Sequence, residues 1–181
     1  MLGTLATEPA LDRTDLLAAS VTSALAEWAR AKDVFVAPID ADLADTAAFC
    51  EAYQVRLDES ANCVIVAGKR DGEVRYAACM ILATTRADVN GIVRRHLDVR
   101  KASFAPMAEA VELTGMEYGG ITPIGLPASW PILVDAAVAA TPSVIVGSGL
   151  RRSKIALPGG ALGELPGAVV IEGLGQPLPT A

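Results

Sequence analysis

The chain is poor in the residues that most catalytic and metal sites use. It has a single histidine, His96, and only three cysteines, Cys50, Cys63 and Cys79, among 181 residues. One histidine argues against a Ser-His-Asp triad and against a histidine-based metal site. An odd number of cysteines without a Cys-x-x-Cys pair favours reduced, buried thiols over a disulfide framework. We therefore expect neither a metal nor any other cofactor.

Positive charge and long apolar runs are also scarce. The net charge of −6 argues against broad nucleic-acid binding through many phosphate contacts. No apolar run reaches the length of about 20 residues that a membrane-spanning helix needs. The amino terminus carries Glu8, Asp12 and Asp15 without a basic segment, which is unlike a signal peptide. We expect a cytoplasmic protein without a membrane partner.

The basic residues that are present gather at one point of the sequence. Arg94-Arg95-His96 and Arg100-Lys101 lie within eight positions. Such a patch can meet a polyanion locally, but Lys, Arg and His also favour the last turn of a helix. Both interpretations, a phosphate-binding patch and a solvated helix end, remain open at this point.

The pattern of apolar residues predicts one α+β domain. With 52% hydrophobic and 20% charged residues, the chain can bury a sizeable core. Helical spacing and capping residues predict helices over 15–32, from 42 or 45 to 53, over 87–96 and over 106–115. Short apolar or β-rich runs predict strands at 62–67, 74–83, 131–135, 143–147, 154–157 and 169–171. Because helices and strands do not alternate regularly, a mixed or antiparallel sheet is expected.

The segment 114–127 is too rich in Gly and Pro for a regular element and too apolar for a flexible linker. Gly119 and Gly120 can adopt positive φ and allow another molecule close to the backbone, while Pro123 and Pro127 fix the chain direction. A shaped loop of this kind can present main-chain groups to a ligand. The alternative is a connector that only turns the chain.

Several spaced segments resemble the YbaK/prolyl-tRNA-editing family of aminoacyl-tRNA deacylases. Gly119 and Pro123 are similar to the two fixed positions of that family's Gly-x-x-x-Pro loop. The other similar segments are Asp45-Thr46-Ala47 before Phe49, Lys101–Ala105 before Pro106, Leu133-Val134-Asp135, and Val146–Gly149 with Arg151. The resemblance covers about 34–157.

The resemblance implies a fold, an activity and a partner. The implied fold is a compact α+β domain around a mixed, mostly antiparallel, partly barrel-like sheet. We expect a single domain over 1–172, with an additional helix at 15–32 and a flexible tail at 173–181. The implied activity is hydrolysis of the ester in mischarged tRNA by a free-standing protein. The implied partner is the 3′ end of an aminoacyl-tRNA, and a synthetase is the candidate protein partner.

The resemblance also implies which residues form the site. The implied catalytic residues are Asn62, Gly119, Gly120 and Pro123. The implied substrate-binding residues are Thr46, Ile121, Thr122, Asp135, Gly147, Ser148, Gly149 and Arg151. Backbone groups of the loop and of the 147–149 turn would then position the ester, with a ribose hydroxyl assisting proton transfer. Thr46 and Asp135 also suit helix or turn caps, and Ser148 also suits a turn between glycines.

One departure from the family pattern concerns charge. Members of the family usually carry a lysine at the position that Asn62 occupies, in a Lys-Ser/Thr-Leu context. Asparagine can form hydrogen bonds but supplies no cation. Lys69 lies about seven residues further along the strand, too far to substitute. The alternative function is therefore a noncatalytic binding module of the same fold, and a purely structural domain is a third.

Overall fold

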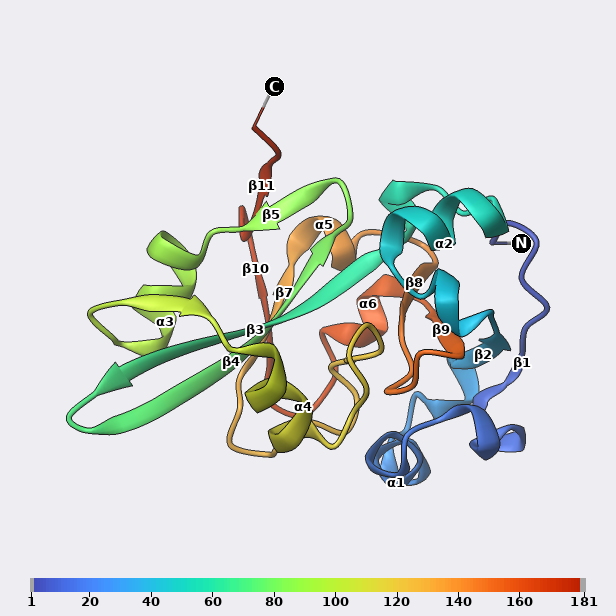
Figure 1. The fold of residues 1–181 in the computed structure, drawn as a ribbon, viewed down its shortest axis with the longest axis horizontal. Helices are drawn as coiled ribbons and strands as arrows, with labels where there is room; N and C mark the ends of the chain where they lie inside the picture. The colour runs from blue at the N-terminus through green and yellow to red at the C-terminus, as the bar shows by residue number, and fades with distance from the viewer. Residues whose placement is uncertain (1, 180–181) are drawn as a thin grey trace.

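Three β-sheets form the framework of residues 2–179, which a computed structural model describes (Figure 1). The strands are β1 Glu8–Pro9, β2 Phe35–Pro38, β3 Ala61–Arg70, β4 Glu73–Leu82, β5 Thr85–Ala87, β6 Ala102–Phe104, β7 Ile132–Asp135, β8 Val144–Gly147, β9 Ser153–Leu157, β10 Ala168–Ile171 and β11 Gly175–Pro177. The α-helices are α1 Ala19–Glu27, α2 Thr46–Tyr53, α3 Arg94–Leu97, α4 Met107–Thr114, α5 Ala136–Ala139 and α6 Gly159–Leu162.

The largest sheet is built around the β3–β4 hairpin. Its strand order is β10-β7-β4-β3-β6, with β3 antiparallel to β4 and to β6. β7 lies parallel to β4, and β10 lies parallel to β7. The hairpin turn is Asp71-Gly72, and both residues have positive φ, as a two-residue type I′ turn requires. The mixed sheet and the hairpin confirm the α+β class that the sequence predicts.

The second sheet packs against the first across the main core. Its order is β1-β2-β9-β8, and all its neighbours are antiparallel. Met80 and Val134 of the first sheet share one buried cluster with Val146 and Ile155 of the second and with Leu25 of α1. Burial of side chains of this size contributes about 1.5–3 kcal/mol each before entropy costs are subtracted. This core fixes the distance between the two sheets.

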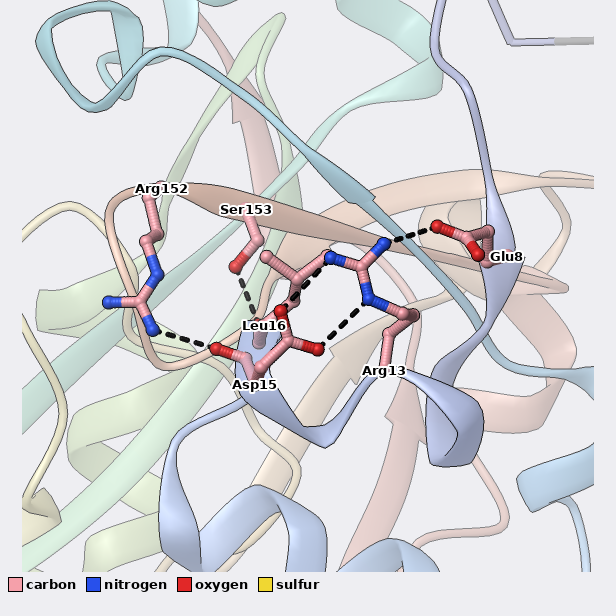
Figure 2. Close-up of polar contacts among 6 residues, drawn as sticks. All are labelled: Glu8, Arg13, Asp15, Leu16, Arg152 and Ser153. Carbon is pink, nitrogen blue, oxygen red and sulfur yellow. Dashed lines mark hydrogen bonds and ion pairs between the residues drawn. The ribbon is translucent and has the colours of Figure 1, made fainter.

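The segment before α1 is tied to the start of β9 by a group of polar contacts (Figure 2). Ser153 donates its hydroxyl hydrogen to the Leu16 carbonyl at 2.6 Å, and Arg152 donates to the Asp15 carbonyl at 2.7 Å. Arg13 forms a two-bond ion pair with the Asp15 carboxylate at 2.9 and 3.0 Å. The amino-terminal segment thus holds the turn that leads into β9.

These contacts explain why the helix predicted over 15–32 is shorter than expected. The regular helix α1 begins at Ala19 and ends at Glu27, and 3₁₀ turns cover Thr14–Leu16 and Ala31–Asp33. The carbonyls of Asp15 and Leu16 accept hydrogen bonds from the β9 turn rather than from the next helical turn. Tertiary contacts therefore override the local helical pattern.

The helix predicted over 87–96 is also different. Thr85–Ala87 is the strand β5, and the helical region starts after Asp88, whose carboxylate accepts from the backbone N–H groups of Gly91 and Ile92 at 3.0 Å each. A π-helical turn covers Val89–Val93 and leads into α3. The other two predicted helices are confirmed as α2 and α4, and the residue after α4, Gly115, has φ of 66°.

The segment predicted as a flexible tail contains a strand. Gly175–Pro177 forms β11 and pairs antiparallel with β5, and the preceding Leu174 is fully buried. A tail prediction based on prolines and glycines misses this pairing because the sequence predicts no strand at 85–87, and places Ala87 at the start of a helix. Residues 180 and 181 of the predicted tail lie outside the described residues.

The cysteines, the helices and the candidate metal-ligating residues can now be located in the structure. Cys50 and Cys79 are buried, Cys63 is half-buried, and all three are free thiols. Within residues 2–179, no helix combines the length and the apolar character needed to cross a membrane. In the same part of the chain, no group of three or more His, Cys, Asp or Glu side chains is placed to hold a metal ion.

Candidate active site

A cavity of about 320 Å³ brings together residues from five separate segments of the chain. Its walls come from the start of α2, the start of β3, the loop after α4, and the neighbouring strands β8 and β9. Five of the residues predicted for the site line it: Thr46, Asn62, Gly119, Ile121 and Gly147. The fold therefore assembles positions that are up to about a hundred residues apart in the sequence.

A larger cavity of about 490 Å³ lies elsewhere and contains none of the predicted residues. It is lined mainly by apolar side chains of the amino-terminal segment and β2, together with the 141–143 segment and the end of β9. Ester hydrolysis needs hydrogen-bond donors and a positioned water. The smaller cavity, where Thr46, Asn62 and Lys154 supply hydrogen-bond donors, is therefore the better candidate site.

Asn62 and Thr46 contact each other directly on the cavity wall. The Thr46 hydroxyl donates to Oδ1 of Asn62 at 2.7 Å. Thr46 is the first residue of α2, and the N-cap residue Asp45 makes no side-chain capping bond. The contact orients the Asn62 amide so that its nitrogen, a donor of two hydrogen bonds, is left for a ligand.

The loop after α4 packs on the turn after β8 through backbone contacts. The Gly149 N–H donates to the Gly120 carbonyl at 2.7 Å, and the Glu117 N–H donates to the Gly149 carbonyl at 2.9 Å. A Cβ atom at Gly147 would lie 2.4 Å from the Gly120 oxygen, and one at Gly120 would lie 2.6 Å from the Leu150 oxygen. The glycines of this region thus allow the loop and the turn to approach each other.

Arg151 braces the loop from outside the cavity. Its guanidinium donates to the carbonyls of Tyr118 at 3.0 Å and Ala41 at 3.1 Å. It also lies 5.8 Å from the centroid of the Tyr118 ring, a cation–π distance. Gly119 has φ of 80°, and a Cβ there would lie 2.6 Å from Nη1 of Arg151. Arg151 thereby fixes the position of the backbone that forms one wall.

Seven of the predicted site residues do not line the cavity: Gly120, Thr122, Pro123, Asp135, Ser148, Gly149 and Arg151. Ser148 is fully buried, and its hydroxyl lies 2.7 Å from that of Ser153 inside the turn. Thr122 is also fully buried, and Pro123 lines a separate groove beside Trp28 and Trp130.

Asp135 lies at the end of β7, in a different part of the sheet. It is 3% exposed, and one of its carboxylate oxygens would lie 2.9 Å from a Cβ at Gly175. Its neighbours are therefore β10 and the β11 segment rather than the cavity walls.

Lys154 also lines the cavity, although the sequence does not predict it as a site residue. Its side chain is 92% buried, with Nζ 3.0 Å from the Ala44 carbonyl and 5.3 Å from the centroid of the Phe49 ring. Burial lowers its pKa from 10.5 to about 8. The available signal was one charged residue in the otherwise apolar strand 153–157, which indicates a lysine held inside the protein.

Cys63 also lines the cavity, but it is poorly suited to act as a nucleophile. Burial raises the pKa of its thiol far above the ordinary value of 9.0. The reactive form of a cysteine is the thiolate, which is scarce at neutral pH under these conditions. The geometry thus favours a bound water over a protein nucleophile.

Comparison with known proteins places this geometry in a family. No curated protein sequence matches the chain. A solved structure described as a candidate trans-editing enzyme for prolyl-tRNA synthetase is 21% identical, with a TM-score of 0.72 over 86% of this chain and 94% of the other. A hypothetical protein is 24% identical, with a TM-score of 0.72 over 84% and 99% of the two chains. Residues 40–165 match the aminoacyl-tRNA editing domain family, and this chain belongs to that family.

Proposed function

We propose that the chain is an aminoacyl-tRNA deacylase that acts in trans on mischarged tRNA. The observation that carries the proposal is the cavity in which Thr46, Asn62 and Gly119 lie together with a buried lysine. Such a cavity offers side-chain and backbone donors to an ester but no protein nucleophile. Membership of the editing domain family supports the same substrate class.

The proposed reaction needs one water and one ester. The water oxygen forms a bond to the acyl carbon, while the π electron pair of the carbonyl moves to its oxygen. When this pair returns, the bond from carbon to the ribose oxygen breaks. The proton released by the water is transferred to that ribose oxygen, with the neighbouring ribose hydroxyl assisting. The products are a free amino acid and a tRNA with an intact 3′ terminus.

The cavity walls favour a small amino acid. Ala44, Ala61, Val64 and Ile121 supply short or branched apolar side chains around the polar groups. Apolar walls of this kind discriminate against larger side chains by size, although each methylene contributes only about 1–3 kcal/mol of discrimination. We propose alanine, serine or cysteine as the amino acid that is removed.

A basic surface near the hairpin tip is the proposed contact for tRNA phosphates. Lys69 and Arg70 at the end of β3 line one hollow together with Asp71 and Arg100, and Lys69 lines another with Lys101. Figure 1 shows the hairpin extending away from the second sheet, with α3 beside it. Arg70 is paired with Asp98, whereas Lys69, Arg100 and Lys101 are exposed. This arrangement supports the phosphate-binding interpretation of the patch that the sequence contains.

A panel of mischarged tRNAs tests the proposed function. The purified protein is incubated with tRNAs that carry alanine, serine or cysteine, and release of the amino acid is measured against buffer alone. We expect accelerated release from at least one of them. Gly119→Val should abolish it, because the added side chain would enter the space between the loop and Arg151.

The same panel separates the alternatives. A noncatalytic binding module would bind a hydrolysis-resistant aminoacyl-adenosine analogue without releasing any amino acid from the tRNAs. A purely structural domain would show neither binding nor release. Either result would overturn the proposed function.

A further inference from the structure

We propose that Lys154 is a catalytic residue of this cavity: its ammonium group binds the acyl carbonyl oxygen of the ester and stabilises the negative charge that develops there. The proposal rests on the proposed function and names the group that performs its central electrostatic step. Among the described residues that line the cavity, Lys154 is the basic one, and Asn62 is uncharged.

The hydrogen bonds of Lys154 leave part of its ammonium unused. A lysine ammonium has three N–H donors. Within residues 2–179, one acceptor lies within hydrogen-bond distance of Nζ, the Ala44 carbonyl at 3.0 Å, and no carboxylate oxygen lies within 4.0 Å. A side chain that is 92% buried can find its remaining acceptors only in the cavity that it lines. An oxygen of a bound ligand fits this requirement.

A buried cation without a carboxylate partner is costly for a fold to keep. Removal of an ammonium from water is unfavourable unless it is paired, and an apolar residue of similar size would serve packing better. The ring of Phe49, 5.3 Å away, compensates only in part. Retention of the charge at this position is therefore more easily explained by a ligand than by stability.

The backbone of Lys154 is held by the strands on both sides of β9 and by the residue that precedes it. In the sheet it pairs with Gly147 on β8 and with Ala37 on β2, so its strand is not an edge. The preceding Ser153 is anchored to the Leu16 carbonyl (Figure 2). A donor held in this way needs little reorganisation when charge develops on the ester, which is the condition for electrostatic stabilisation.

The lowered pKa of Lys154 still leaves the ammonium protonated at neutral pH. Burial has the largest effect and lowers its pKa, the Cys50 side chain raises it, Arg151 lowers it and Asp45 raises it, and the resulting pKa is about 8. The proposed charge is thus present at pH 7 and is lost as the pH rises through about 8. Enzymatic deacylation, corrected for the spontaneous reaction, should decrease over the same interval.

The test measures deacylation by Lys154→Met with the tRNA that the wild-type protein cleaves fastest. We expect kcat to fall by about 100-fold or more, the cost of losing one oxyanion donor, with KM changed by less than about threefold. The matched control is Lys32→Met, an exposed lysine in the 31–33 turn, which should retain wild-type rates. Lys154→Arg should lose the decrease in rate above pH 8, because a guanidinium stays charged there.

Three results would overturn the proposal. If the wild-type protein releases no amino acid from any tRNA, the proposed function fails and the role of Lys154 fails with it. If the wild-type protein is active and Lys154→Met keeps its kcat within tenfold, only the role of Lys154 fails. An increase in KM at unchanged kcat, with weaker binding of the hydrolysis-resistant analogue, would assign Lys154 to ground-state binding and overturn the catalytic role.

Discussion

Replacement of Lys154 by methionine should make the folded protein more stable at pH 7, even though it removes a native hydrogen bond. The pKa of Lys154 is lowered from 10.5 to about 8, mainly by burial, and this difference corresponds to about 3 kcal/mol of unfavourable free energy for the charged form in the folded state. Loss of the bond to the Ala44 carbonyl costs about 1 kcal/mol. The expected net gain is about 2 kcal/mol.

The sign of this effect should change with pH. Between pH 8 and 10.5 the unfolded chain keeps the lysine proton and the folded protein loses it, so the stability of the wild-type protein rises with pH. The advantage of Lys154→Met should therefore shrink above pH 8 and reverse near pH 10. Burial raises the pKa of Cys50, Cys63 and Cys79, which lowers stability above pH 9 in both proteins and largely cancels in the difference.

Urea unfolding followed by tryptophan fluorescence measures this difference. Trp28 and Trp130 both pack against the main core and should report its loss. Midpoints for both proteins at pH 7, 8, 9 and 10 give the free energy of unfolding as a function of pH, provided that the slopes agree. A difference that does not depend on pH, or a variant less stable than the wild-type protein at pH 7, would refute the claim that Lys154 is a buried charge with a lowered pKa.

Three further predictions concern the cavity and the basic surface near the hairpin tip. Gly147→Ala should lower stability by about 1–3 kcal/mol in thermal unfolding, because its Cβ would lie 2.4 Å from the Gly120 oxygen, whereas Gly160→Ala, with 3.6 Å to its nearest neighbour, should not. Asn62→Lys should not raise deacylation, because it adds a second ammonium to the cavity of Lys154; a severalfold gain would contradict this. Arg100→Glu should weaken tRNA binding and reduce its salt dependence while leaving cleavage of aminoacyl-adenosine unchanged.

The sheet and its hairpin were predictable because their signals are local. Alternating and apolar runs at 62–67 and 74–83, separated by Asp71-Gly72, define two strands and a tight turn without any distant contact. The short strands β2 and β6 carry no such signal and form because β9 and β3, respectively, lie beside them. Helix ends near Asp15 were misplaced for the same reason, since their hydrogen bonds go to residues more than a hundred positions away.

The candidate site was predictable where the family pattern marks it, as at Asn62 and Gly119. The role of the glycines was harder to foresee, because a Cβ at Gly120 would meet the backbone of Leu150 and one at Gly147 would meet the backbone of Gly120 and Ile121, rather than a ligand. The single charge in the apolar strand 153–157 indicates a buried lysine but not its place in the site. The pairing of β9 with β8 and the hydrogen bond to the Ala44 carbonyl show that Lys154 lies in the same cavity as Asn62.

The central claim is that this cavity hydrolyses the ester of mischarged tRNA with the help of Lys154. The most direct measurement is the single-turnover release of amino acid from alanine-, serine- and cysteine-charged tRNA at pH 7, for the wild-type protein and for Lys154→Met in parallel. We predict fast release from at least one tRNA by the wild-type protein and about 100-fold slower release by the variant. Equal rates for the two proteins, or no release above buffer by either, would contradict the account.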